Sequence, residues 1–286
     1  MSAYLGVDVG ASTLAVVVGD ETGTVHGRYR AATPQQGEGG DIVDAVLDGI
    51  RAACEDAGVD PASIVAAGIG AVGPQDAAAG AVVSPVNLPG VERIDLVDPV
   101  ARLLDADVRL HNDATAAVIG ERFAADGDPR NLVYLTISTG LGAGAIVDGT
   151  VLAGKFGNAA EVGHFTQDPD ATLVCGCGSP GHWEAFCGGA NLPAHARALA
   201  EEVDTSLDLV DCGPADLLDA AGTDPLATRL VQRLGHWNAV GVSMLVHAFD
   251  PERVVVGGGV ARNHPETILE PIRDRLPTHT LRPPPP

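Results

Sequence analysis

Four side chains between residues 164 and 182 have the types and spacing of a soft-metal site. Cys175 and Cys177 lie in a glycine-rich loop, His182 follows on the same loop, and His164 precedes it. Two thiolates and two imidazoles make a closed tetrahedral zinc set, and glycines let such a loop curl until its ligands converge. We therefore expect a structural zinc site. Cys187 is a rival ligand, and the alternative interpretation is two buried thiols beside ordinary histidines.

Two carboxylates flank this set and suggest a polar ligand beside the metal. A histidine that gives one ring nitrogen to zinc can hydrogen-bond a ligand through the other, which points to His164. Glu161 and Glu184 would then border the same cavity. Carboxylates that accept hydrogen bonds suit a polyhydroxylated substrate. The alternative is that both glutamates are simply solvated.

Two hairpins of similar layout stand upstream of these residues. In the first, strands Tyr4–Val9 and Leu14–Val18 flank the turn Gly10–Thr13; in the second, strands Leu132–Ile137 and Ala145–Val147 flank the turn Ser138–Gly144. Small-residue turns present backbone N–H groups that suit phosphate oxygens, and Asp8 beside the first turn can orient a water on Mg²⁺. The repetition predicts a duplicated fold with a nucleotide between its halves, unless it is a coincidence of two common hairpins.

Further candidates follow the ends of other expected strands. Asn112 and Asp113 connect strand Val108–Leu110 to a helix over Ala114–Phe123, and ligands of open α/β sheets lie in such loops. Asp113 is alternatively only a helix cap. Asn87, in a proline-bounded loop, is either a turn residue or a ligand contact.

The remaining expected elements complete an α/β pattern. Helices are expected over Asp41–Ala57 and Pro225–Ala248, and buried strands over Ile64–Ile69 and Val254–Val256. Three glycines, Gly257, Gly258 and Gly259, follow the last strand and would allow close approach of a flat ligand such as adenine.

Composition narrows the class of protein. The net charge is −21, which disfavours binding to the nucleic-acid backbone. Acid excess with Lys155 as the only lysine suggests adaptation to high salt, and an acidic mesophilic protein is the alternative. No apolar run of membrane length and no leader is seen, so we expect a cytoplasmic protein without membrane contact. The five cysteines favour metal binding in a reducing compartment over disulfides.

These motifs together resemble the ROK family of sugar kinases and repressors, and within it the bacterial-type glucokinases. The resemblance covers Tyr4 to about Ala261 and is most specific at Ala160–His164 and Cys175–Glu184. The segments Asp8–Thr13 and Thr136–Gly144 look like the two phosphate motifs. Asn112–Ala116 looks like the catalytic segment, and Val256–Gly259 like the adenosine motif.

The resemblance implies an α/β protein with the actin-like ATPase (ribonuclease H-like) fold, two α/β domains around a cleft, here 1–113 and 114–286 with the zinc-binding loop in the second. It implies ATP, Mg²⁺ and structural zinc, a hexose substrate with glucose favoured, a role in glycolysis, and a homodimer or homotetramer. Asp113 would be the general base. Residues implied to hold the sugar are Asn87, Asn112, Asp113, Glu161, His164 and Glu184. Residues implied to hold the nucleotide are Asp8, Gly10, Ala11, Ser12, Thr13, Thr139, Gly140, Gly142, Gly257, Gly258 and Gly259.

Four departures from the family pattern qualify this expectation. His182 replaces a zinc cysteine, Ala160 replaces a glycine, and Thr13 stands where many members carry lysine. The chain also turns to prolines soon after the adenosine motif, which suggests a shortened end that affects nucleotide binding. The competing functions are a non-catalytic sugar-binding protein and a sugar-responsive transcription regulator of the same family.

Overall fold

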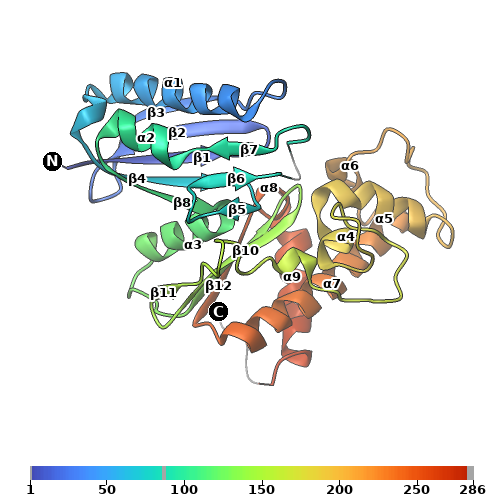
Figure 1. Cartoon of the computed structure of the whole chain (residues 1–286). Helices are drawn as coiled ribbons and strands as arrows, with labels where there is room; N and C mark the ends of the chain where they lie inside the picture. The colour runs from blue at the N-terminus through green and yellow to red at the C-terminus, as the bar shows by residue number, and fades with distance from the viewer. Residues whose placement is uncertain (1, 86–87, 282–286) are drawn as a thin grey trace. The chain divides into compact units, whose positions relative to one another are not determined.

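The computed structural model describes residues 2–85 and 88–281 (Figure 1). The candidate sugar contact Asn87 and the proline-rich tail lie outside these residues. The described chain forms two compact units. The first contains the residues up to Ala117 together with Ala153–Ala159, and the second contains Val118–Leu152 and the residues from Ala160 onward. The domain boundary expected after residue 113 stays a prediction.

The first unit is built on a five-stranded sheet of order β3-β2-β1-β4-β8. Its strands are β1 (Ala3–Val9), β2 (Thr13–Gly19), β3 (Val25–Ala32), β4 (Ile64–Ala71) and β8 (Asp107–Asn112). The first three strands form an antiparallel meander, while β4 and β8 run parallel to β1. Successive side chains of β1 point to opposite faces of the sheet, and one face buries Leu5, Val7 and Val9. These residues share a core with Val46 and Ile50 of helix α1 (Gly39–Ala57) (Figure 1).

The smaller elements of this unit extend its core, to which they add the fully buried Val82, Ile94 and Leu104. They are the 3₁₀ helix η1 (Pro61–Ser63), strands β5 (Gln75–Asp76), β6 (Ala81–Val83) and β7 (Arg93–Asp95), and helix α2 (Val97–Leu104). The sequence pattern missed strand β3, and its burial explains why. Within β3 only Gly27 is buried, so this edge strand carries no apolar alternation that would reveal it.

The second unit is built on a four-stranded sheet of order β11-β10-β9-β12. Its strands are β9 (Leu132–Ile137), β10 (Leu141–Val147), β11 (Thr150–Val151) and β12 (Arg253–Gly257), with β12 parallel to β9. Strand β10 begins at Leu141, so the turn expected to extend to Gly144 is wrong. Leu141–Gly144 pair with β9 instead, because their carbonyl and amide groups continue the antiparallel ladder.

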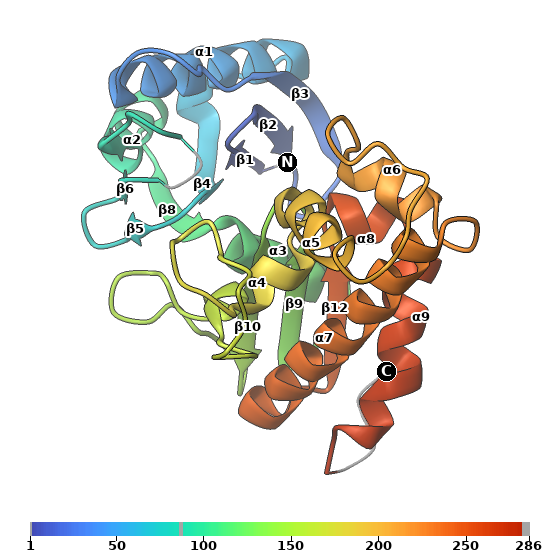
Figure 2. The ribbon, with the colours of Figure 1, turned by 90° about the vertical axis from the view of Figure 1, so that its right-hand side faces the viewer.

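Helices supply most of the core of this unit (Figure 2). They are α3 (Asp113–Ala124), whose first turn belongs to the first unit, α4 (Trp183–Cys187), α5 (Leu192–Leu199), α6 (Pro214–Asp219), α7 (Pro225–Phe249), α8 (Gly259–Asn263) and α9 (Pro265–Arg275), with 3₁₀ turns η2 (Val162–His164), η3 (Gly189–Asn191) and η4 (Leu276–Thr278).

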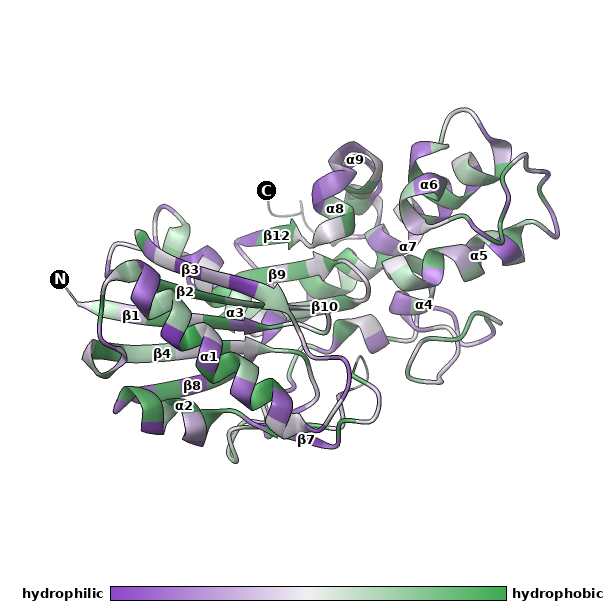
Figure 3. Ribbon diagram, turned by 90° about the horizontal axis from the view of Figure 1, so that it is seen from above, coloured by the Kyte–Doolittle hydropathy of each residue, from purple (hydrophilic) through white to green (hydrophobic). Residues whose placement is uncertain are grey.

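The long helix α7 follows its expected course within one or two residues. The Asp224 carboxylate caps its start by accepting hydrogen bonds from the N–H groups of Leu226 and Ala227. Leu230 and Leu234 lie on the buried stripe that the sequence predicts. Figure 3 shows the apolar residues of the sheets and the mixed polarity of α7 and α9. In residues 2–85 and 88–281, no helix combines the length and apolar character needed to cross a membrane.

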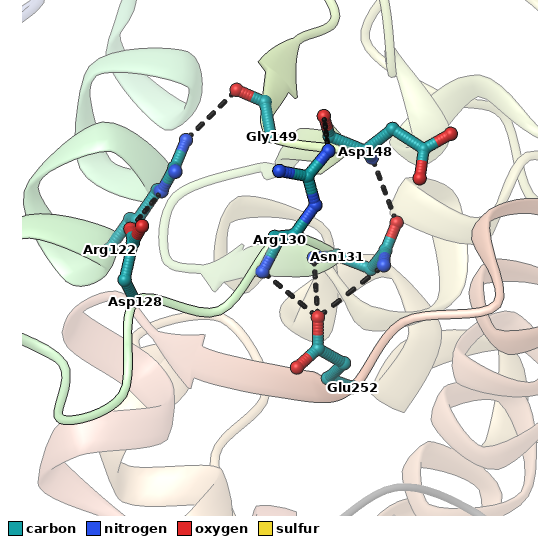
Figure 4. A network of polar contacts seen from close by, with 7 residues as sticks. All are labelled: Arg122, Asp128, Arg130, Asn131, Asp148, Gly149 and Glu252. Carbon is teal, nitrogen blue, oxygen red and sulfur yellow. Dashed lines mark hydrogen bonds and ion pairs between the residues drawn. The ribbon is translucent and has the colours of Figure 1, made fainter.

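A polar network fixes the end of the second sheet at which β9 and β12 begin (Figure 4). The Glu252 carboxylate accepts hydrogen bonds from the backbone N–H groups of Arg130 and Asn131, each at 2.9 Å. The Asn131 side chain accepts from the N–H of Asp148, and the Arg130 guanidinium donates to the Asp148 carbonyl. The network therefore sets the parallel register of β9 and β12 at the end opposite to the 138–140 turn.

Candidate functional site

In the first unit, the parallel strands bring two carboxylates to the same edge of the sheet. Asp8 on β1 pairs with Gly70 on β4, which pairs with His111 on β8, and Asp113 follows two residues later. A Cβ at Gly70 would lie 3.8 Å from the Asp113 Cα atom and only 3.1 Å from the Cβ of Ala116. The missing side chain of Gly70 thus lets the first turn of α3 lie over β4.

Both carboxylates have raised pKa values. Desolvation by the surrounding protein raises the pKa of Asp113, against the lowering effect of backbone N–H donors. Desolvation also raises the pKa of Asp8, with the negative charge of Asp113 as a further cause and Arg30 as an opposing one. Both side chains still contact solvent. A reachable carboxylate with increased basicity is what general-base chemistry requires.

The start of α3 also tests the capping interpretation of Asp113. The N–H of Ala114 donates to Asn112 Oδ1 at 2.9 Å and to Asp113 Oδ1 at 2.7 Å. Asn112 and Asp113 therefore share the capping of this N–H. Capping and catalysis are compatible uses of the Asp113 side chain.

The turn Gly10–Thr13 is held in shape through its carbonyl groups. The Thr33 hydroxyl donates to the Gly10 carbonyl at 2.7 Å, and the Thr33 N–H donates to the Ser12 carbonyl at 3.1 Å. The Gln35 amide donates to the Ala11 carbonyl at 2.7 Å. Sequence reasoning missed Thr33 and Gln35, because nothing in a short polar segment after an unrecognised edge strand marks it as a support for this turn.

In the second unit, Glu184 connects the second turn to the cysteine loop. Its Oε2 atom accepts a hydrogen bond from the N–H of Leu141 at 2.9 Å, directly after Thr139 and Gly140. A Cβ at Gly140 would collide with this same carboxylate. The other oxygen, Oε1, accepts from the Cys175 thiol at 3.2 Å. Glu184 thus positions the turn, while Gly142 lies within β10 and not in the turn.

The three glycines after β12 have different surroundings. A Cβ at Gly257 would collide with the Tyr134 hydroxyl, and one at Gly258, whose φ is +91°, would collide with the backbone carbonyl of Ile137. A Cβ at Gly259 would meet nothing closer than the Ser138 hydroxyl at 3.5 Å. Packing against β9 therefore explains the first two glycines, and ligand approach remains an expectation for the set.

The four expected metal ligands converge in the second unit. One donor atom from each of His164, Cys175, Cys177 and His182 lies within 4.8 Å of all the others. The Cys175 Sγ atom is 3.7 Å from His164 Nδ1, and the Cys177 Sγ atom is 3.3 Å from His182 Nδ1. A tetrahedron with bonds of about 2.0 Å to nitrogen and 2.3 Å to sulfur has edges of roughly 3.3–3.8 Å. Donor types and spacing therefore fit zinc.

Backbone geometry explains how the loop gathers these donors. Gly178 and Gly181 have φ values of +90° and +69°, which other residues adopt only with strain. A Cβ at Gly181 would also collide with the Asp168 carbonyl. Trp183, two residues after Gly181, is fully buried and donates its indole N–H to the side chain of Asn238 on α7 at 3.0 Å. This anchor sets the direction of its neighbours His182 and Glu184.

The remaining cysteine of the segment is placed elsewhere. The Cys187 thiol is buried on α4, 4.0 Å from the carbonyl oxygen of Leu234, and burial raises its pKa. It is not in the group of converging donors. Burial also raises the pKa of Cys175 and lowers that of His182. A bound metal would oppose the effect on Cys175 by favouring its thiolate, and it would favour the neutral imidazole of His182, as burial already does.

His164 faces two kinds of neighbour. Its Nδ1 atom points to the cysteine loop, and its Nε2 atom lies 3.9 Å from the Glu161 carboxylate. The turn η2 follows Glu161 directly, and Gly163 within it packs so closely on Leu141 that a Cβ there would collide with the Leu141 carbonyl. Glu161, His164 and Glu184 are thus assembled within one unit, around the start of β10 and the cysteine loop.

Comparison with known proteins finds the family that these sequence motifs indicate. The profile of the ROK family matches residues 4–285. A glucokinase from Pyrobaculum calidifontis is 36% identical over 282 residues, covering 96% of this chain and 86% of the relative. A glucokinase from Streptomyces coelicolor is 34% identical, with coverages of 96% and 86%.

Solved structures agree with the fold. The ROK hexokinase from Thermus thermophilus is similar with a TM-score of 0.83 and 32% identity, covering 99% of this chain and 91% of that one. A ROK family glucokinase from Streptomyces griseus, in complex with glucose and AMPPNP, is similar with a TM-score of 0.78 and 32% identity. The match covers 98% of this chain and 90% of that one. The expected actin-like ATPase fold is confirmed, and this chain belongs to the ROK family.

Proposed function

We propose that this chain is an ATP-dependent hexose kinase that transfers the γ-phosphoryl group to the primary 6-hydroxyl of its sugar. The observation that carries this assignment is the solvent-accessible Asp113 carboxylate with its raised pKa, at the end of β8 and beside Asp8. Relatives and solved structures above 30% identity bear the names glucokinase and hexokinase, which supports the same reaction class.

Asp113 is the proposed general base. Phosphoryl transfer depends mainly on positioning and on charge stabilisation, so the protein has one proton to manage. The Asp113 carboxylate accepts that proton from the attacking hydroxyl as the bond to the phosphorus forms. The Ala114 N–H holds Oδ1 of this carboxylate at 2.7 Å, which orients the group before the substrate arrives. The raised pKa increases the proton affinity of this carboxylate.

The phosphates are assigned to the two small-residue turns. Gly10–Thr13 of the first turn, and Thr139 and Gly140 of the second, would bind phosphate oxygens through backbone N–H groups. Hydrogen bonds from Thr33 to the first turn and to Glu184 from the residue after the second turn fix the backbone of both turns, which supports a role in phosphate binding. Mg²⁺ would neutralise phosphate charge, with Asp8 orienting one of its waters. Gly257–Gly259 are proposed to border the adenosine.

The sugar is assigned to the polar side chains that the family motifs indicate. Asn112, Asp113, Glu161, His164 and Glu184 would hold its hydroxyl groups. Zinc on His164, Cys175, Cys177 and His182 would supply structural support alone, since four protein ligands leave no open position. His164 would then present its Nε2 atom, beside Glu161, to a hydroxyl.

Glucose is the proposed sugar, since the printed names of the first relatives are glucokinases. An N-acetylmannosamine kinase from Escherichia coli O157:H7 is 29% identical over 90% of this chain, so related hexoses belong in the test. A ROK transcriptional regulator of known structure shares 24% identity, which supports only the common fold. The regulator interpretation is therefore the weaker one.

A direct assay separates the kinase from a non-catalytic sugar-binding protein. Purified protein would be supplied with ATP, Mg²⁺ and one sugar at a time: glucose, mannose, fructose or N-acetylmannosamine. ADP release would be coupled to pyruvate kinase and lactate dehydrogenase, in dilute and in molar KCl. We expect sugar-dependent ADP formation, fastest with glucose. Sugar binding by calorimetry without any ADP formation would contradict the assignment.

A further inference from the structure

A cavity between α7 and α9 is lined almost wholly by basic side chains. Its volume is about 360 Å³, and its lining comprises Arg229, Gln232, Arg233, His236 and Arg275. Ligand sites in proteins span roughly 300–1,000 Å³, so the cavity has room for a small molecule. The concentration of positive charge is unusual here, because the chain carries a net charge of −21 and only 17 Lys and Arg residues.

Helical periodicity explains the lining. The four α7 residues stand at positions i, i+3, i+4 and i+7, so they share one face of the helix. Gly235 brings α9 against this face, since a Cβ there would lie 2.5 Å from the Pro271 Cβ and 3.2 Å from the Arg275 Nη1. The Arg275 guanidinium is thereby held beside α7, with a hydrogen bond to the Pro271 carbonyl at 3.3 Å.

Among the residues that the structure describes, no carboxylate pairs with the lining arginines Arg229, Arg233 and Arg275. The Nε atom of Arg233 is buried and has no hydrogen-bond partner among the described residues. A buried charged donor without an acceptor costs stability, so this position favours an anion that supplies one.

His236 is a further basic side chain in the lining of this cavity. Its ring lies 6.2 Å from that of His279, measured between centroids. Burial lowers the pKa of His236, and the positive charges of His279, Arg233 and Arg275 lower it further. The groups facing His236 are thus basic, and an entering anion would make its protonated form more favourable.

We propose that this cavity binds a small phosphoryl-bearing anion at a site separate from the proposed kinase site. Guanidinium groups donate pairs of parallel hydrogen bonds to phosphate oxygens, and three of them surround the volume. Arg275 ends α9, which spans 11 residues and is therefore about 16 Å long. The helix runs away from α8 and from the Gly257–Gly259 segment (Figure 2). Inorganic phosphate and a sugar phosphate share the required chemistry.

Equilibrium dialysis with radiolabelled inorganic phosphate tests the site on the full chain, at one fixed KCl concentration. We expect saturable binding that Arg229→Gln and Arg233→Gln each weaken about tenfold or more, as loss of a charged hydrogen bond does. Arg229 is exposed, and within the described residues its side chain makes one hydrogen bond, to Gln232 at 3.4 Å, so its substitution should leave folding intact. Arg273→Gln, an exposed change on α9 outside the cavity lining, is the matched control for the loss of one positive charge.

Competition then identifies the source of the phosphoryl group. Unlabelled hexose 6-phosphate and ADP would be added separately, and the better competitor indicates the natural ligand class. Equal phosphate affinity in the wild type, Arg229→Gln and Arg233→Gln proteins would overturn the proposal, as would the absence of saturable binding. If Arg229→Gln alters the sedimentation of phosphate-free protein without altering phosphate affinity, a second copy occupies this face and the proposal is wrong.

Discussion

Replacing Asp113 by asparagine is the most direct test of the proposed base. The substitution keeps the size of the side chain and an oxygen that can accept the hydrogen bond now made by the Ala114 N–H at 2.7 Å. Asn112 Oδ1 accepts from the same N–H at 2.9 Å, so the start of α3 keeps a cap in either case. What disappears is the proton acceptor.

The expected loss follows from this geometry. A positioned general base contributes about 10²–10⁴ to the rate, which corresponds to a barrier increase of about 2.7–5.4 kcal/mol. We therefore expect kcat of Asp113→Asn to fall by roughly a hundredfold or more. Sugar affinity, measured by calorimetry, should change little, since hydrogen bonding to a hydroxyl persists.

A matched substitution controls for the loss of one negative charge. Asp44→Asn removes an exposed carboxylate on α1 in the same unit, and its kcat should equal that of the wild type. Near wild-type turnover of Asp113→Asn would refute the base assignment. A fall in kcat of equal size in both variants would show that general charge, and not the proton acceptor, is responsible.

The pH dependence supplies an independent check. The base must be ionised to act, and burial raises the pKa of Asp113 above the ordinary value of 3.8. The rate constant kcat/KM should therefore fall as pH decreases through this raised pKa, at a higher pH than an unperturbed carboxylate would give. An acid limb at or below the ordinary value would contradict the desolvated environment described for Asp113.

Three further predictions concern metal, core and charge. Elemental analysis should find about one zinc per chain, kept in His182→Cys and Cys187→Ala and lost in His182→Ala, and the reverse pattern would make the ligand set wrong. Trp183→Ala should lower the free energy of unfolding in urea by about 3–5 kcal/mol, and a loss below about 1 kcal/mol would mean that Trp183 is no anchor. The melting temperature should rise from dilute buffer to molar KCl, where the Debye length is about 3 Å, and a flat response would remove the high-salt argument.

Local sequence predicts those parts of the molecule whose signal is periodic or chemical. Apolar alternation and glycine turns predict β1, β9 and the hairpins, and the 3.6-residue stripe predicts α7 almost to its last residue. Cysteines and histidines at close spacing predict the four converging donors, since a short loop has few ways to arrange them. The family motifs likewise predict the fold, which the solved relatives confirm.

Tertiary structure decided what depends on contacts between distant segments. Strand β3 has no apolar alternation and exists because β2 offers it an edge. The extra length of β10 comes from its ladder with β9. Glu184 carries one charge whose two oxygens bind Leu141 and Cys175, and no spacing rule reveals that link.

The cavity between α7 and α9 also depends on contacts between distant segments, which the sequence alone does not reveal. Its α7 residues recur at helical spacing, which in the sequence is typical of an ordinary solvated face. Only packing across Gly235 adds Arg275 from α9, some forty residues later. The Arg233 Nε atom is buried, and none of the described residues accepts a hydrogen bond from it. Local sequence determines which face of a helix is charged, because periodicity is a property of the backbone. What that face encloses depends on the helix that packs against it.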